Sequence, residues 1–154
     1  MAISTDAEIE FYGTQDTLGS TTSAVADAAF SAGTSDITAW TNDDDAITAS
    51  VVLEGNYTSA PTANTVVNLF MRKLNIDDGG AEDEPVPDAN NRHSYAGTFF
   101  LNDATGAFTL GIDIALPNNR TSQIYEPYIE NMAGQSLPAG WDLHITPKAR
   151  GPHP

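Results

Sequence analysis

Apolar and polar residues alternate along several short stretches of this chain, which is typical of strands with one buried face. The clearest case is Trp141, Leu143 and Ile145, which alternate with polar residues. Residues 108–114 repeat the pattern, with a large apolar side chain at every second position. Clusters of Asn, Asp, Gly and Pro, which favour chain reversal, separate these stretches. The predicted strands are 7–12, 23–30 (which also fits a helix), 37–41, 47–54, 66–74, 95–101, 107–116, 124–130 and 141–146.

Two pairs of these strands have the sequence of antiparallel neighbours. Residues 95–101 and 107–116 flank a turn, 102–106, with a hairpin signature. Residues 124–130 and 141–146 flank a loop that contains Gly134 and Pro138. The strand 66–74 carries apolar residues on both faces, which indicates a central strand or one at an interface.

The spacing of the strands and turns predicts an all-β fold, an antiparallel β-sandwich or jelly roll in a single domain of 154 residues. We divide the chain into an N-terminal strand plus low-complexity arm (1–35), the sandwich (36–147) and a proline-rich tail (148–154). The arm is rich in Thr, Ser, Ala and Gly, so we expect it to become ordered against a neighbour. The prolines of the tail exclude a helix and argue against an internal strand.

The charge balance excludes several classes of partner. Six Lys and Arg face 21 Asp and Glu, for a formal charge of −15, and the first basic residue is Arg72. Phosphate backbones and anionic membrane surfaces both favour clustered cations, so we expect no nucleic acid and no membrane as partners. The charge then either keeps the protein soluble or faces solvent on a larger assembly. The chain has no cysteine, no apolar run long enough to cross a bilayer, and no pattern of a signal peptide.

No arrangement of residues predicts catalysis, and we expect no enzyme activity and no cofactor. The chain lacks cysteine, a G-x-S-x-G motif and a glycine-rich phosphate loop. Glu126 and Glu130 stand on one face of a strand about 13 Å apart by strand rise, which is too far for a glycosidase pair. The three histidines, His93, His144 and His153, have no zinc-motif spacing.

Two weaker binding signals remain. The segment 77–88 contains six acids, which supply the oxygen ligands that Ca²⁺ takes, but the spacing of a calcium loop is absent. We expect a solvated loop there and leave weak Ca²⁺ binding open. Tyr57, Tyr125 and Tyr128 are candidate glycan contacts, because aromatic faces stack on sugars and jelly rolls often serve as lectins. The competing interpretation is that these rings pack in the core.

Five short stretches resemble a family of small all-β virion structural proteins of tailed bacteriophages and prophages. The likeness runs from about Ile3 to the C-terminal end, and its motifs are turns and strand ends. They are 40–45 (WTNDDD), 116–119 (LPNN), 128–131 (YIEN), 140–149 (GWDLHITPKA) and 151–152 (GP). The resemblance implies a decoration or cement protein on the outside of the capsid, with no active-site residues.

The resemblance also implies partners and a location. The partners are the major capsid protein and further copies of this chain, which we expect to form a homotrimer at the three-fold points of the lattice. The location is the exterior of the virion head, after synthesis in the host cytoplasm. The alternative is a carbohydrate-binding, adhesin-like module on the tail or head. The candidate contacts with the capsid or with other subunits are Phe70, Leu74, Phe30, Lys148 and Arg150.

Overall fold

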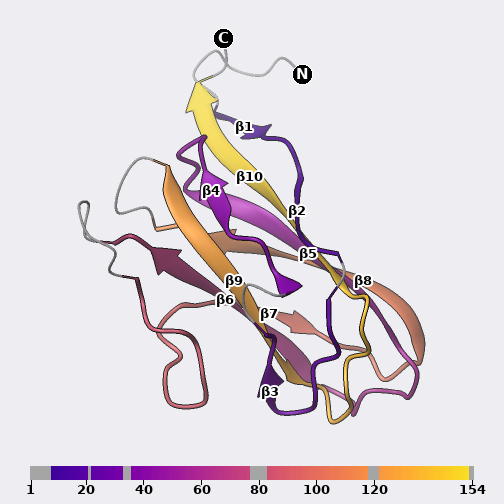
Figure 1. The fold of residues 1–154 in the computed structure, drawn as a ribbon. Coiled ribbons are helices and arrows are strands. Elements are labelled where there is room, and N and C mark those ends of the chain that lie inside the picture. The colour runs from indigo at the N-terminus through magenta and orange to yellow at the C-terminus, as the bar shows by residue number, and fades with distance from the viewer. Residues whose placement is uncertain (1–7, 21, 33–35, 77–82, 118–121, 153–154) are drawn as a thin grey trace, which may run out of the picture.

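A computed structural model describes residues 8–20, 22–32, 36–76, 83–117 and 122–152. In these residues strands form two antiparallel sheets that pack against each other, which confirms the β-sandwich (Figure 1). The strands are β1 (Glu8–Tyr12), β2 (Asp16–Gly19), β3 (Ala29–Phe30), β4 (Trp40–Asn42), β5 (Thr48–Tyr57), β6 (Val66–Leu74), β7 (Tyr95–Phe100), β8 (Gly106–Ala115), β9 (Gln123–Met132) and β10 (Asp142–Pro152).

The order of the strands gives the sandwich the topology of a jelly roll. The first sheet has the order β1-β10-β5-β8, and β2 also pairs with β10. The second sheet has the order β3-β9-β6-β7, and β4 also pairs with β9. Strands β1 and β2 both lie beside β10, so together they occupy one strand position, and β3 and β4 likewise share one position beside β9. Each sheet therefore has four strand positions, as in a double-sheet jelly roll.

The two predicted strand pairs are wrong, although their strands are present. Strand β7 pairs with β6 in the second sheet, whereas β8 pairs with β5 in the first. Strands β9 and β10 likewise lie in different sheets. Each turn carries the chain across the sandwich, over a gap of about 10 Å between packed sheets. Turn residues specify that the chain reverses, and they do not specify which strand becomes its neighbour.

The core between the sheets contains the residues that the alternation places on one face. Leu143 and Ile145 of β10 pack there with Val51 and Leu53 of β5, all fully buried. Trp141, just before β10, is also buried, and its indole Nε1 donates a hydrogen bond to the Ser23 carbonyl at 2.9 Å. The predicted inner face of this strand is therefore the face that packs in the core.

From β2 onward, the described part of the arm packs on its own sandwich. Strand β2 pairs with β10, and Leu18 and Val25 are buried in the core. The Thr22 hydroxyl donates to the Trp141 carbonyl at 2.6 Å. Of the predicted strand 23–30, only Ala29 and Phe30 form a strand. The small side chains of this segment bury little area. The segment is nevertheless ordered because its backbone groups pair with β10 and β9.

The predicted tail boundary at residue 147 falls inside a strand. Strand β10 continues to Pro152 and pairs with β1 along residues 148–152. Pro147 lies between β5 and the chain that follows β1, and its carbonyl still accepts a hydrogen bond from the Gly13 backbone N–H at 2.9 Å. A proline removes one donor from a strand but keeps its acceptor, so this strand tolerates both prolines.

Candidate functional site

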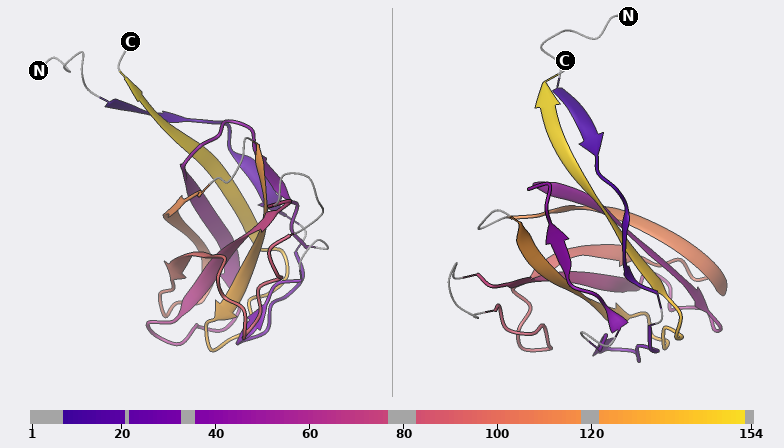
Figure 2. Two further views of the ribbon diagram at one scale, coloured as in Figure 1. Left: turned by 90° about the vertical axis from the view of Figure 1, so that its left-hand side faces the viewer. Right: turned by 45° about the horizontal axis from the view of Figure 1, so that its top comes forward.

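Strands β1 and β10 form a two-stranded ribbon that extends beyond the body of the sandwich (Figures 1 and 2). The last pair that β10 makes with β5 is Lys148 with Thr48, so residues 149–152 pair with β1 alone. A two-stranded ribbon is only marginally stable in water without packing on one of its faces. The ribbon is therefore the part of the described chain that most needs a further surface.

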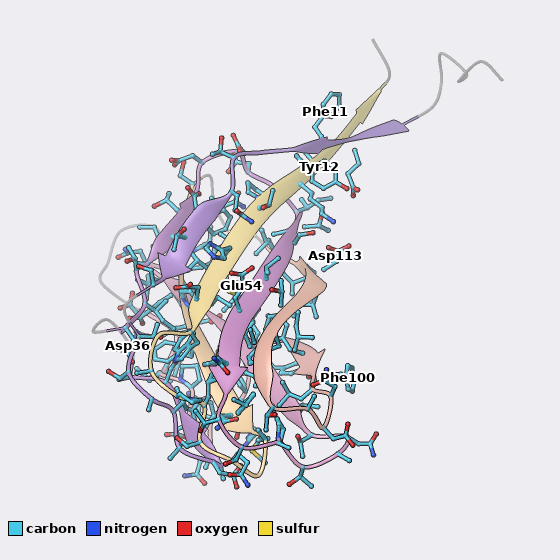
Figure 3. The ribbon with its side chains drawn as sticks, turned by 90° about the vertical axis from the view of Figure 1, so that its right-hand side faces the viewer. Phe11, Tyr12, Asp36, Glu54, Phe100 and Asp113 are labelled. Carbon is cyan, nitrogen blue, oxygen red and sulfur yellow. The ribbon has the colours of Figure 1, made fainter. Side chains whose placement is uncertain are left out.

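Two large side chains near the base of the ribbon are exposed. Phe11 is 49% and Tyr12 is 61% exposed, and Figure 3 shows both standing out from the strands. Beside them lies a cavity of about 300 Å³, which Asp44 and Pro147 also line. Exposed aromatic rings next to a hollow are typical of a contact surface. The alternation in the sequence does not distinguish them from core residues.

Lys148 is a contact within the chain, contrary to its predicted role on the capsid surface. Its buried side chain places Nζ 2.7 Å from Asp113 Oδ1 and 5.2 Å from the centre of the Tyr12 ring. The hydrogen bond with Asp113 raises the pKa of Lys148, and it lowers the pKa of Asp113, which also accepts a hydrogen bond from Ser50. Arg150 pairs with Glu10 through the backbone, and its side chain lies outside the described residues.

The outer face of the second sheet holds two buried carboxylates, each with its own arginine. Arg72 Nη1 lies 2.6 Å from Glu126 Oε2, and Arg92 binds both oxygens of Glu130. The Tyr128 hydroxyl donates a hydrogen bond to Glu126 at 2.8 Å. Burial of the ring, and secondly this hydrogen bond, raise the pKa of Tyr128 to about 12. Each buried carboxylate therefore has an arginine as its ion-pair partner on the same face.

Aromatic rings complete this covered face, and they correct two of the predicted contacts. Phe70 is fully buried, with its ring 5.3 Å from Phe30 and 5.8 Å from Tyr95 between ring centres. Phe30 is partly buried under the guanidinium of Arg92, at 5.8 Å. Phe70 therefore cannot contact a partner, and Phe30 offers only part of its surface. Leu74, at the end of β6, is partly buried.

The three tyrosines proposed to bind glycans are buried, so the predicted platform is wrong. Tyr57 donates to Asn131 Oδ1 at 3.1 Å and stacks on Phe108, and Tyr125 donates to the Pro117 carbonyl at 3.2 Å. Burial raises the pKa of both tyrosines to about 12. Tyr128 belongs to the covered face described above. The hydroxyls have partners inside the protein, which is how a tyrosine is accommodated in a core.

The acidic loop 77–88 is described only from residue 83 onward. Asp83 Oδ1 accepts the Asn75 backbone N–H at 2.8 Å, and Glu84 Oε2 accepts that of Lys73 at 3.0 Å. Asp88 Oδ1 accepts the backbone N–H of Asn90 at 2.7 Å. These three acids therefore fix the local backbone. Residues 77–82, where a Ca²⁺ site would need its other ligands, lie outside the described residues.

An apolar row that the sequence pattern did not predict lies on the outer face of the second sheet. Phe100 of β7, Val66 of β6 and Met132 of β9 stand in register across three adjacent strands. Phe100 is 75% exposed and points away from the body in Figure 3. Two adjacent phenylalanines on one strand must point to opposite faces. The pair Phe99 and Phe100 in the sequence therefore indicates an apolar side chain on each face of the sheet. One of the two had to lie outside the core.

Comparisons with known proteins include a distant structural likeness. No protein-family model matches the chain, and no curated protein matches it. The fold is similar to a solved structure of Desmodium yellow mottle tymovirus, with a TM-score of 0.37 and 13% sequence identity, over 96% of this chain and 88% of that one. Likeness at this level supports no conclusion about function. The part of the chain that the structure describes contains no helix that is long and apolar enough to span a membrane.

Proposed function

We propose that this protein is a virion structural protein of a tailed bacteriophage, which binds the outside of the capsid as a decoration or cement protein. The observation that carries the proposal is the β1–β10 ribbon, which continues beyond the pairing of β10 with β5 and exposes Phe11 and Tyr12. A surface that accepts the ribbon would bury its faces and supply the packing that it lacks. The major capsid protein is the proposed partner.

Charge and site chemistry favour the same role. A formal charge of −15 disfavours any position against packed DNA, whereas the outer surface of a head imposes no such cost. The buried carboxylates of the second sheet are paired with arginines, so the protein would act through binding and not through catalysis. The jelly roll itself supports many functions and does not decide among them.

The structure alters which residues would make the contact. Lys148 and Phe70 are engaged within the chain, and Phe11 and Tyr12 of the ribbon replace them. The protein would bind as a homotrimer at a local three-fold point, where each copy repeats one set of contacts. The row of Phe100, Val66 and Met132 is the exposed apolar area that a second copy would cover. The ribbon and this row then have different partners.

Binding to purified heads that lack the protein tests the capsid role. We expect the wild-type protein to sediment with the heads, and the double variant Phe11→Ser/Tyr12→Ser to bind at least tenfold more weakly. Val86→Ser, which removes a half-exposed apolar side chain away from the ribbon, is the matched control and should bind normally. Binding confined to tails, or equal binding of the double variant, would contradict the proposal.

The homotrimer is tested separately by light scattering. We expect the wild-type protein to trimerise on heads or in solution, and Phe100→Ser to weaken that association while Val86→Ser leaves it unchanged. The Phe100 side chain is largely exposed, so its replacement should not unfold the monomer. A Phe100→Ser protein that assembles as well as the wild type would place the subunit contact elsewhere.

A further inference from the structure

Three side chains of the kinds that bind metals meet on the outer face of the first sheet. They are Glu54 of β5 and Asp142 and His144 of β10, and none of them is fully exposed. One carboxylate oxygen from each acid and one ring nitrogen of His144 all lie within 4.8 Å of one another. The strands bring them together because Glu54 and Asp142 are cross-strand partners and His144 is the next outward residue of β10. Figure 3 looks onto this face and labels Glu54.

The two acids of this group repel each other across the strand pair. Like charges directly opposite in a sheet are destabilising. Among the residues that the structure describes, no lysine or arginine forms an ion pair with Glu54 or Asp142. The nearest base on this face of β10 is Lys148, which lies six residues beyond Asp142 and is paired with Asp113. A bound cation would supply the missing positive charge.

The ring of His144 has a hydrogen-bond partner beside the two acids. Its Nδ1 lies 3.1 Å from the Thr17 hydroxyl of β2. When Nδ1–H donates to that hydroxyl, the lone pair of Nε2 is free, which is the tautomer that metal-binding histidines adopt. The pairing of β2 with β10 shifts register at this point, between Leu143 and His144. Such bulges re-aim side chains next to functional sites.

We propose that Glu54, Asp142 and His144 bind one divalent transition-metal ion, with Zn²⁺ as the representative. One imidazole and two carboxylates form the mixed nitrogen and oxygen set that Zn²⁺ accepts, whereas Ca²⁺ takes six to eight oxygens. Tetrahedral bonds of about 2.0–2.2 Å place neighbouring ligand atoms roughly 3.3–3.6 Å apart. Rotation of these partly exposed side chains closes the remaining distance. Three protein ligands leave a position for water or for a donor from a neighbouring molecule.

Calorimetric titration of the full chain with ZnCl₂, after treatment with a chelator, tests this site. We expect one equivalent to bind, and Glu54→Gln or His144→Gln to weaken the affinity at least tenfold. Thr17→Val should weaken it about tenfold, because partners of metal-binding histidines contribute that much. Asp103→Asn removes the same charge from an exposed turn and should leave the affinity unchanged.

Nitrogen-15 spectra of the histidine rings give a second readout that does not depend on affinity. Zn²⁺ should shift Nε2 of His144 and leave His93 and His153 unmoved. Circular dichroism without metal should show that every variant is folded. The proposal is overturned if Zn²⁺ does not bind at millimolar concentration, or if Glu54→Gln and His144→Gln bind it as tightly as the wild type. Shifts confined to His93 would assign the ion to the acidic loop and would also overturn it.

Discussion

The two outer faces of the sandwich carry charge in opposite ways. On the second sheet, Glu126 and Glu130 are almost fully buried, and each is bound to an arginine. On the first sheet, Glu54 and Asp142 face each other on an uncovered surface with no described cation beside them. The first arrangement pairs its buried charges within the chain, whereas the second is the one for which we propose a bound ion.

Three of the six bases of this very acidic chain are bound to its own carboxylates. Arg72, Arg92 and Lys148 each bind a carboxylate of the same chain. The two arginines also hold the segment 83–95 against the second sheet. Arg72 contacts the Glu84 carbonyl and Asp83, and Arg92, which lies in the segment, binds Glu130. These three pairings reduce the positive charge that an acidic partner could meet. Under the proposed capsid role, the exposed rings of the ribbon would therefore carry much of the contact.

The largest expected effect concerns the core that both faces share. Trp141→Ala should lower the free energy of unfolding by about 3–5 kcal/mol, since it removes a buried aromatic side chain and leaves a cavity. Chemical denaturation followed by circular dichroism measures this loss. An unchanged midpoint would mean that the wrong face of β10 has been assigned to the core.

The covered face should be the next most sensitive. Arg72→Met should cost about 3 kcal/mol, because it leaves the Glu126 carboxylate buried without its partner. Adding Glu126→Gln to that variant should recover much of the loss, since the uncompensated charge is then removed. If Arg72→Met unfolds at the wild-type denaturant concentration, the pair is not buried in solution.

The ion pair on the open face should contribute far less. Asp113 is 70% exposed on its side chain, so Asp113→Asn should cost only about 0.2–1 kcal/mol. The lowered pKa of Asp113 means that this contribution is present above the ordinary aspartate value near 3.9 and is lost as the pH falls through the folded value. The unfolding curves of wild type and variant should converge in acid. Curves that stay separate below that pH would assign the difference to another interaction.

The smallest effect should have the opposite sign. Without metal, Glu54→Gln should raise the free energy of unfolding by a few tenths of a kcal/mol, because it relieves the repulsion from Asp142. With Zn²⁺ present, the wild type should gain stability and the variant should not. A variant that is less stable than the wild type in the absence of metal would show that the two acids do not repel.

The sequence predicted the longer strands because alternation is a local property, but it did not predict β2, and only two residues of the predicted strand 23–30 form a strand. The limits of β6 match the predicted 66–74, and β8 lies within one residue of its prediction at each end. Strand neighbours were not predictable from the turns, since a turn such as 102–106 serves a hairpin or a crossing between sheets equally well. The apolar outer face of β6 also has its explanation elsewhere in the chain, in Phe30 and Tyr95, which cover Phe70.

The candidate sites depended on contacts that no local pattern contains. Tyr57, Tyr125 and Tyr128 are amphipathic rings, and only the tertiary structure shows that their hydroxyls have partners inside the protein. Glu54 lies 88 positions before Asp142 in the sequence, so their meeting with His144 follows from strand register alone. Histidine spacing along the chain could not reveal a site built from two strands.

The position of β10 has a consequence for how the protein is made. This strand lies between β5 on one side and β1 and β2 on the other, and contacts such as Thr48 with Lys148 span 100 residues. Contacts this distant in sequence slow folding. Until residue 142 and the rest of β10 have left the ribosome, the nascent chain exposes strand edges and apolar inner faces that β10 would cover. This exposure promotes aggregation. Protection of these edges until residue 142 has left the ribosome would therefore limit aggregation.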